Sequence, residues 1–148
     1  MDIYKVREVR AEDLPRLAEI ERECIPEPWS VKAFEAEFAA KGAVFLAAEN
    51  ENGEICGFVT ASSVLDEVNV NNVAVTASCR RKGIATLLMN ALWDKVKDFA
   101  TFVTLEVRES NAPAAALYEK LGYEKVGVRK NFYSNPCENA ILMTKYKE

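Results

Sequence analysis

The segment around Gly83 constrains the fold most, because the spacing of apolar residues changes there from a strand period to a helix period. Three strand-like stretches come first, and the turn sequence Asn52-Gly53 between the first two predicts a β-hairpin. The stretches are residues 43–49, 55–65 and 68–75. After Gly83, apolar residues recur at intervals of three and four, as on one face of an amphipathic helix. They are Ile84, Leu87, Leu88, Ala91, Leu92 and Val96. The sequence therefore predicts an antiparallel meander followed by a long helix that ends near Asp98.

The residues before the meander predict one strand and two helices. The chain opens with a short strand-like stretch. Its apolar residues are Ile3, Val6 and Val9. Helical spacing follows over residues 14–24, until Pro26 and Pro28 end that helix. Ser30 is a natural N-cap for a second helix, and Gly42 is expected to end it.

The residues after the long helix predict a strand, a helix and two more strands. A buried strand is expected over residues 102–107. Asn111 and Pro113 are typical of a helix start, and Gly122 is typical of a helix end. Final strands are expected at residues 123–128 and 140–143, with a loop at 131–139. The order β-α-α-β-β-β-α-β-α-β-β predicts one α/β domain over residues 1–148, with a mixed sheet flanked by helices.

The composition excludes several kinds of site. The chain has no histidine, which removes the Ser-His and Cys-His dyads and the commonest zinc ligand. No Cys-x-x-Cys spacing is present, so we expect reduced, mostly buried thiols and no metal site. The cysteines are Cys24, Cys56, Cys79 and Cys137. A net charge of −4 argues against binding to nucleic acid. Because the sequence shows neither an apolar run of about 18 residues nor a signal sequence, we expect a cytoplasmic protein without membrane contact.

Residues 73–86 have the layout of an anion-binding loop. The strand Val73-Ala74-Val75 leads through a basic loop into the start of the long helix. The first N–H groups of a helix have no partner within it, and its N-terminus carries partial positive charge. A pyrophosphate could bind there, although a charged loop before a helix is also common without any ligand. The loop and helix start are Arg80, Arg81, Lys82, Gly83, Ile84, Ala85 and Thr86.

This loop resembles the coenzyme A pyrophosphate loop of the GNAT acetyltransferases, commonly Gln/Arg-x-x-Gly-x-Gly/Ala. Two further motifs follow in the order of that family. They are Leu105-Glu106-Val107-Arg108, and Ser110-Asn111 with residues 116–123. The resemblance implies the GNAT fold, with a mixed, mostly antiparallel sheet of about seven strands and about four helices. It also implies acetyl-coenzyme A as cosubstrate, without a metal.

Three other segments are similar to the RimI-type ribosomal-protein-alanine N-acetyltransferases. They are Pro28-Trp29-Ser30, residues 64–67 and residues 129–133. This resemblance implies transfer of an acetyl group to the N-terminal α-amine of a protein, with a ribosomal protein that has a basic tail as the expected partner.

Acetyl transfer to an amine requires a base, because a protein α-amine has a pKa of about 8 and only its neutral form attacks. Glu106 lies near the end of an apolar strand, where partial burial would raise its pKa, and it matches the base of the family. Tyr118 matches the family's general acid, although aromatic residues at helical spacing are more often part of a core. Asn111 resembles a coenzyme A contact and is also a natural N-cap. The family fold implies that backbone N–H groups at the end of the strand Val73–Val75 hold the oxyanion.

The resemblance also implies where the acceptor binds. Trp29, Tyr133 and the loop that carries Asp66 and Glu67 are expected to wall the acceptor channel. The two carboxylates of that loop would attract a basic tail. Trp29 is equally suited to a hydrophobic staple that packs under the second helix.

Two departures from the family pattern leave the acceptor open. Phe132 stands where relatives often have Tyr, and Asn139 stands where they often have Asp. Another N-terminus, a lysine side chain or a small amine therefore remains possible as acceptor. A non-catalytic acyl-coenzyme A binding module is an alternative of a different class, and the presence of both Glu106 and Tyr118 argues against it. The sequence predicts no oligomeric state.

Overall fold

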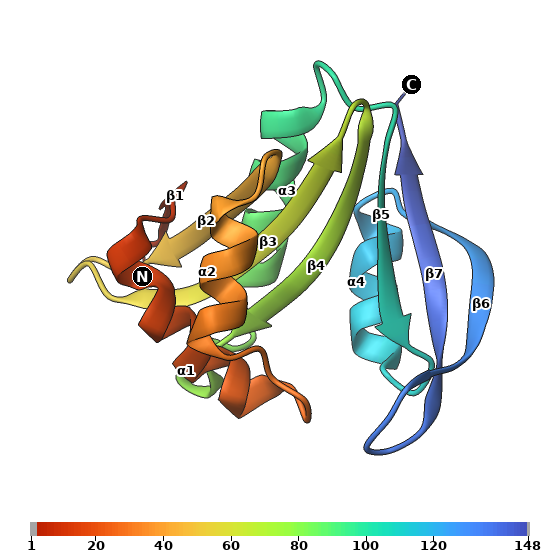
Figure 1. The fold of residues 1–148 in the computed structure, drawn as a ribbon, viewed down its shortest axis with the longest axis horizontal. Helices are drawn as coiled ribbons and strands as arrows, with labels where there is room; N and C mark the ends of the chain where they lie inside the picture. The colour runs from red at the N-terminus through yellow and green to blue at the C-terminus, as the bar shows by residue number, and fades with distance from the viewer. Residues whose placement is uncertain (1–2, 148) are drawn as a thin grey trace.

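Residues 3–147 form one seven-stranded sheet with helices on both faces in the computed structural model (Figure 1). The strands are β1 (Lys5–Glu8), β2 (Ala43–Glu49), β3 (Ile55–Val64), β4 (Glu67–Val75), β5 (Phe102–Arg108), β6 (Glu124–Tyr133) and β7 (Glu138–Tyr146). The helices are α1 (Leu14–Cys24), α2 (Val31–Ala39), α3 (Ile84–Val96) and α4 (Ala112–Lys120), with short 3-10 turns at Ala11–Asp13 and Ala77–Cys79. The predicted order of strands and α-helices is confirmed. Met1, Asp2 and Glu148, which the predicted domain includes, lie outside the described residues.

The strands follow the spatial order β1-β2-β3-β4-β5-β7-β6. Every neighbouring pair is antiparallel except β4 and β5, which are parallel. The mixed, mostly antiparallel sheet expected from the sequence is therefore confirmed. Within residues 3–147, no helix is long and apolar enough to cross a membrane.

Two hydrophobic clusters cover opposite faces of the sheet. One joins α3 and α4 to the strands, and the other joins α1 and α2 to β2–β4 (Figure 1). In β2, Val44 belongs to the first cluster and its neighbour Phe45 to the second. Because successive side chains of a strand point to opposite faces, both faces of β2 are buried. This explains why β2 and most of β3 are continuously buried, whereas β4 and β5 alternate between buried and partly exposed residues.

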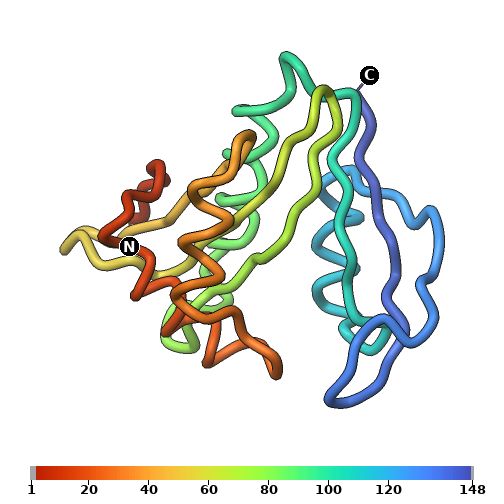
Figure 2. Tube along the Cα trace, viewed as in Figure 1, coloured from red at the N-terminus to blue at the C-terminus, as the bar shows by residue number. Residues whose placement is uncertain are grey.

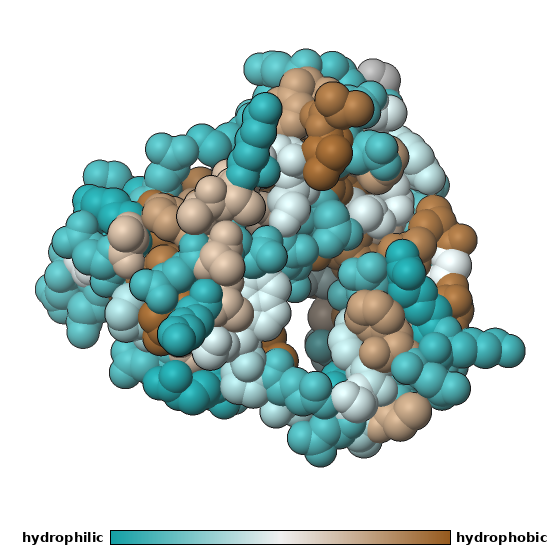
Figure 3. Space-filling view, in the orientation of Figure 1, coloured by the Kyte–Doolittle hydropathy of each residue, from teal (hydrophilic) through white to brown (hydrophobic). Residues whose placement is uncertain are grey.

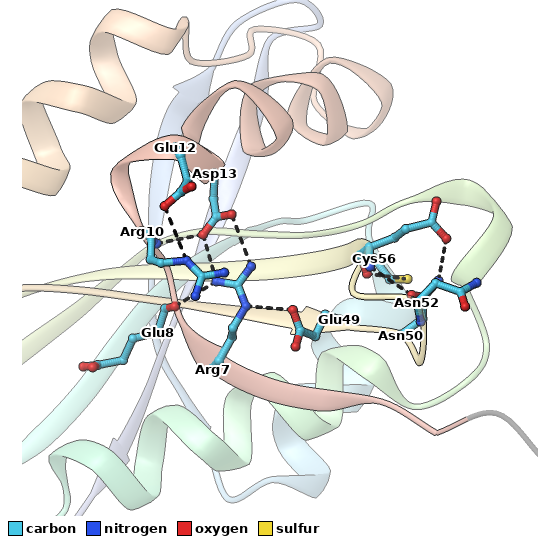
Figure 4. A network of polar contacts seen from close by, with 10 residues as sticks. Arg7, Glu8, Arg10, Glu12, Asp13, Glu49, Asn50, Asn52 and Cys56 are labelled. Carbon is cyan, nitrogen blue, oxygen red and sulfur yellow. Dashed lines mark hydrogen bonds and ion pairs between the residues drawn. The ribbon is translucent and has the colours of Figure 1, made fainter.

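A charged network fixes β1 and the start of α1 (Figure 4). Arg7 donates from Nε to Glu49 of β2 at 2.8 Å and from Nη1 to Asp13 at 2.8 Å. The Arg7 guanidinium lowers the pKa of both carboxyls through these hydrogen bonds. Since Asp13 immediately precedes Leu14, the network sets the position at which α1 begins. The other end of α1 borders the candidate site.

The predicted helix caps are confirmed. Ser30 accepts a hydrogen bond at its Oγ from the Ala33 N–H at 3.1 Å, and Asn111 accepts one at its Oδ1 from the Ala114 N–H at 3.2 Å. Each bond satisfies an N–H group that has no partner within the helix.

Several predicted boundaries are wrong. The strand β6 continues to Tyr133 and β7 begins at Glu138, so most of the expected loop at 131–139 is strand. The strand β6 lies at the sheet edge and is mostly exposed, which lets polar residues replace an alternating pattern. α2 ends at Ala39, before Gly42, whereas the end of α3 at Val96 agrees with the predicted end near Asp98. Of the four thiols, only that of Cys56 is buried, and Cys137 is exposed, which corrects the expectation of mostly buried thiols.

β4 and β5 separate along most of their length (Figure 2). They pair only where Glu67–Asn69 of β4 meets Phe102–Thr104 of β5. A β-bulge at Asn71 follows immediately, because Thr60 of β3 is opposite Asn72 while Ala61 is opposite Val70. Bulges bend a strand and increase its twist. The two carboxyl ends of these parallel strands therefore diverge and leave a space between them.

Candidate active site

The space between β4 and β5 is a cleft of about 1030 Å³. In the space-filling view it is an opening between the two halves of the molecule (Figure 3). Its walls come from β4, β5, the connection between α1 and α2, the start of α4, and the connection between β6 and β7. The volume lies at the upper end of the range for ligand pockets. The site thus lies at the carboxyl ends of parallel strands, where α/β sheets commonly bind ligands.

One wall of the cleft is an unpaired strand edge. Val73, Ala74 and Val75 of β4 line the cleft, and among the described residues β5 pairs with β4 only up to Asn69. Alternate N–H and C=O groups of that edge are therefore available to a ligand. The Val75 carbonyl already accepts hydrogen bonds from Cys24 Sγ at 3.3 Å and from Arg80 Nε at 3.2 Å. The Arg80 side chain is thus directed to β4, and it lines the cleft.

The start of α3 continues this wall. Gly83 is its N-cap with φ of 77°, and Arg81 also has a positive φ of 64°. Glycine adopts this conformation without the strain that a side chain would cause. Ala85 lines the cleft. The other residues predicted to bind the cofactor lie beside it in the loop or in the first turn of the helix. They are Arg81, Lys82, Gly83, Ile84 and Thr86.

Glu106 lies on the opposite wall. In β5, alternate residues from Val103 to Val107 are buried under α3 and α4, so Glu106 and Arg108 face the other side. Both line the cleft, and the Glu106 side chain is 18% exposed. The expected partial burial is confirmed. The Nε of Arg129 in β6 lies 3.5 Å from Oε1 of Glu106.

Tyr118 enters the cleft from α4. Its side chain is buried, and its ring packs edge-on against Tyr123 with a centroid distance of 5.9 Å. Burial, with a smaller contribution from Tyr133, raises the pKa of Tyr118 to about 12. The phenol therefore keeps its proton throughout the neutral pH range. Tyr118 is part of the core and also lines the cleft, and its role as general acid stays a prediction.

Tyr133 completes this wall at the end of β6. The Arg108 guanidinium lies 4.4 Å from the centre of the Tyr133 ring. The ring of Phe132 packs edge-on against that of Tyr133, with 5.0 Å between the ring centroids. Burial and the nearby charge of Glu106 raise the pKa of Tyr133. Phe132 and Tyr133 both line the cleft, as does Asn111 at the start of α4.

Trp29 forms the hydrophobic staple that the sequence predicts. Its ring packs edge-on against that of Phe34 in α2, with 5.3 Å between the ring centroids. Phe34 packs in the same way against Phe58 of β3, at a centroid distance of 5.6 Å. These are the positions before the N-cap and in the first turns of α2 that a staple joins. Trp29 also lines the cleft, so one side chain both anchors α2 and borders the site.

Asp66 and Glu67 lie elsewhere. Asp66 lies in the turn between β3 and β4, and Glu67 is the first residue of β4, at the end where β4 still pairs with β5. Asp66 accepts hydrogen bonds from Thr101, at 2.5 Å for the side chains and 2.7 Å for the backbone. Neither residue lines the cleft, which corrects the expectation that they wall its acceptor end. β4 and β5 pair at the end that carries Asp66 and Glu67 and separate at the opposite end, where the cleft lies. The strand sequences do not show at which end the separation occurs.

Several polar residues that line the cleft were not predicted from the sequence as site residues. Arg108 donates to Glu138 at 3.1 Å and to the carbonyls of Ser134 and Pro136, which holds the β6–β7 connection against β5. Ser134 donates to Glu27, so this connection meets the α1–α2 connection across the cleft. Glu21 of α1 is fully buried and also lines the cleft. Its place among apolar residues of one helix face is the only sequence signal that could have indicated it.

Comparison with known proteins agrees with this geometry. The family model described as Acetyltransferase (GNAT) family matches residues 14–123. The chain belongs to the GNAT acetyltransferase family. Proteins of this family use acetyl-coenzyme A as acetyl donor.

Relatives of this GNAT acetyltransferase match nearly its whole length. It is 36% identical over 146 residues to the ribosomal protein bS18-alanine N-acetyltransferase of Haemophilus influenzae, which covers 95% of this chain and 97% of that protein. It is 33% identical over 156 residues to an N-alpha-acetyltransferase of Saccharolobus solfataricus, covering 96% of this chain and 92% of that protein. The crystal structure of the ribosomal-protein-S18-alanine N-acetyltransferase from Escherichia coli has a TM-score of 0.91 at 31% identity, covering 99% and 95% of the two chains.

Proposed function

We propose that this chain transfers the acetyl group of acetyl-coenzyme A to the N-terminal α-amine of a protein, with the alanine of ribosomal protein bS18 as acceptor. The observation that carries this proposal is that Glu106, Tyr118 and the free edge of β4 line a single cleft. The similarity to alanine N-acetyltransferases of this ribosomal protein supports it. Such an acceptor places the reaction in the cytoplasm.

The wall formed by the edge of β4 and the start of α3 fits acetyl-coenzyme A. The unpaired edge at Val73–Val75 offers backbone donors and acceptors to an extended amide chain, as a further strand would use them. The free N–H groups at the start of α3 and the basic loop suit a pyrophosphate. Asn111 would add a side-chain contact, although its Oδ1 already caps α4. A bound acetyl-coenzyme A supplies an activated thioester.

In the proposed mechanism Glu106 takes the proton from the acceptor ammonium, directly or through water. Its carboxylate faces the cleft and is not neutralised by a buried partner, since the nearby Arg129 side chain is 54% exposed. General-base catalysis of this kind contributes about 10²- to 10⁴-fold to a rate. Backbone N–H groups of the β4 edge would stabilise the oxyanion that forms when the amine attacks.

Tyr118 donates a proton to the leaving thiolate. A phenol whose pKa is about 12 stays protonated at neutral pH, so the donor is present in nearly every molecule. Direct attack by the amine needs no acetylated enzyme residue. Cys24 lies in the cleft, but its Sγ is engaged with the Val75 carbonyl and Arg80.

The acceptor would enter between the α1–α2 and β6–β7 connections. Trp29 and Tyr133 border this end, together with the carboxylates of Glu27 and Glu138. Arg108 neutralises Glu138, so the remaining charge at this end is negative. A basic N-terminal tail is attracted to such a mouth. These residues replace Asp66 and Glu67 as the acidic groups of the acceptor side.

A single peptide tests the proposal. It carries an N-terminal alanine, several early basic residues and one internal lysine, and it is incubated with the protein and acetyl-coenzyme A. Mass spectrometry should locate one acetyl group on the α-amine. An acetyl group on lysine would contradict the N-terminal specificity, and no modification of this or other amines would favour a module that only binds acyl-coenzyme A.

A further inference from the structure

Glu21 of α1 is a fully buried carboxylate whose hydrogen bonds connect two walls of the cleft. Its Oε2 accepts from the backbone N–H of Trp29 at 2.8 Å. Both oxygens accept from the side-chain amide of Asn72, at 2.7 and 2.8 Å. Asn72 is also buried, and its Oδ1 accepts from Thr60 Oγ1 at 3.1 Å. The carboxylate is thus held by donors from two separate elements.

The two donors belong to parts of the cleft with different tasks. Trp29 lies in the connection between α1 and α2, on the acceptor side. Asn72 follows the bulge at Asn71 and directly precedes the free edge at Val73–Val75, on the cofactor side. Other side chains at the end of α1 also contact this strand and the residue after it, since Cys24 Sγ donates to the Val75 carbonyl at 3.3 Å and Glu23 accepts from Thr76 Oγ1 at 3.0 Å. The Glu21 side chain joins the main chain at Trp29 directly to Asn72, so it sets the spacing of these two residues.

A buried carboxylate is a costly way to connect two elements. Burial raises the pKa of Glu21, which reflects the loss of hydration of the charged form. An apolar residue would serve packing alone at a lower cost, because Glu21 lies on the helix face that carries Leu17 and Ala18. A carboxylate can accept from two donors that approach from different directions, which an apolar side chain cannot do.

We propose that Glu21 is a positioning residue for the acceptor. It fixes the main chain at Trp29 relative to Asn72 and so sets the spacing between the α1–α2 connection and β4. This inference rests on the proposed function, since it assigns Glu21 to the acceptor side of that reaction. All its hydrogen bonds go to Trp29 and Asn72, so the carboxylate acts through these residues and not on the reacting atoms.

The test uses Glu21→Gln and the double variant Glu21→Gln/Asn72→Asp. In the single variant an N–H group of the new amide meets the Asn72 amide donor, so one of the contacts is lost. In the double variant the amide at position 21 can donate to the carboxylate at position 72 while its oxygen still accepts from Trp29, and Thr60 can donate to that carboxylate. Glu19→Gln, on the exposed side of α1, is the matched control.

Steady-state kinetics with the alanine peptide give the decisive values. Glu21→Gln should raise the acceptor KM about tenfold, as expected for a lost hydrogen bond to a charged group. The kcat at saturating peptide and the calorimetric Kd of acetyl-coenzyme A should stay within about twofold. The double variant should bring KM back to within about threefold of the wild type, and Glu19→Gln should leave it unchanged.

Amide hydrogen exchange at Trp29 gives a second readout that does not depend on turnover. Glu21→Gln should speed exchange of this N–H at least about tenfold, and the double variant should slow it again. An unchanged KM and unchanged exchange in a folded Glu21→Gln protein would overturn the proposal. Parallel losses of kcat, acetyl-coenzyme A binding and melting temperature, without rescue, would also overturn it, because they indicate a merely structural role. If the wild type acetylates no peptide, the proposed function fails, and the exchange at Trp29 still decides whether Glu21 fixes the loop.

Discussion

The two arms of the divided sheet are built differently. The N-terminal arm, β1–β4 with α1–α3, is covered by apolar clusters on both faces. The C-terminal arm, β5–β7 with α4, is packed by apolar residues mainly on the α4 face, and its edge strand β6 is largely exposed. Its other face is held by polar contacts such as Arg108 with Glu138 and Thr104 with Thr144.

The two arms contribute different groups to the cleft. The doubly covered arm presents backbone atoms at the β4 edge and the α3 start, and apolar packing holds them in place. The singly covered arm presents side chains on its cleft face, such as Glu106, Arg108 and Tyr133, that lie outside the apolar clusters. We therefore expect substitutions in the first arm to reduce stability and substitutions on the cleft face of the second arm to reduce activity.

The largest expected effect is on the rate, in the C-terminal arm. Glu106→Gln should lower kcat about 10²- to 10⁴-fold, because the amide cannot accept a proton from the acceptor. Calorimetry should show acetyl-coenzyme A binding within about twofold of the wild type. Glu124→Gln, at an exposed position of β6, is the control and should keep full activity. Full turnover by Glu106→Gln would remove the assigned role.

The next effect concerns stability, in the N-terminal arm. Phe58→Ala should lower the free energy of unfolding by about 3–5 kcal/mol, because the ring is completely buried and packs on Phe34. Val128→Ala in β6, where the side chain is 43% exposed, should change it by less than about 0.5 kcal/mol. Urea denaturation measures both. Equal losses in the two variants would show that the arms do not differ in the way described.

A smaller effect is expected at the acceptor side. Arg108→Lys should raise the acceptor KM about tenfold, because an ammonium cannot contact Glu138 and the carbonyls of the β6–β7 connection together. The free energy of unfolding should change by less than about 1 kcal/mol. Arg22→Lys, at an exposed position of α1, should alter neither quantity. A loss of stability without a change in KM would mean that Arg108 serves the fold and not the site.

The last prediction concerns the pH dependence of kcat, in which ionisation of Tyr118 should have no visible effect. With a pKa of about 12, Tyr118 would be only about 1% ionised at pH 10, so kcat should not fall between pH 8 and pH 10 through loss of its proton. The rate should instead rise toward the pKa of the acceptor amine and then level off. The pH profile of kcat, with Tyr118→Phe for comparison, measures this. A descending limb near pH 9 that disappears in Tyr118→Phe would contradict the buried, protonated state of the phenol.

Local features were predicted well from the sequence. The order of elements, the caps Ser30 and Asn111, and the staple Trp29 follow from residues that are neighbours along the chain. The loop before α3 and the partial burial of Glu106 were likewise visible, because glycine conformation and strand periodicity are local properties. The catalytic and cofactor roles of these residues remain proposals that the experiments above address.

Features that depend on contacts between distant segments could not be predicted. The family resemblance placed Asp66 and Glu67 at the acceptor side, whereas β4 and β5 pair at the end that carries these residues and separate at the other end. Glu21, Glu27 and Arg108 were missed because their partners lie far along the chain, such as Asn72 for Glu21 and Ser134 for Glu27.

The sequence by itself thus determined the elements, their order and the loop with the anion-binding layout, since short-range sterics and hydrogen bonding set these. Only the tertiary structure decided where the cleft opens and which polar side chains meet across it. The reason is physical: the divergence of β4 from β5 results from a bulge, a twist and packing on two faces of the sheet, and these act together over the whole fold.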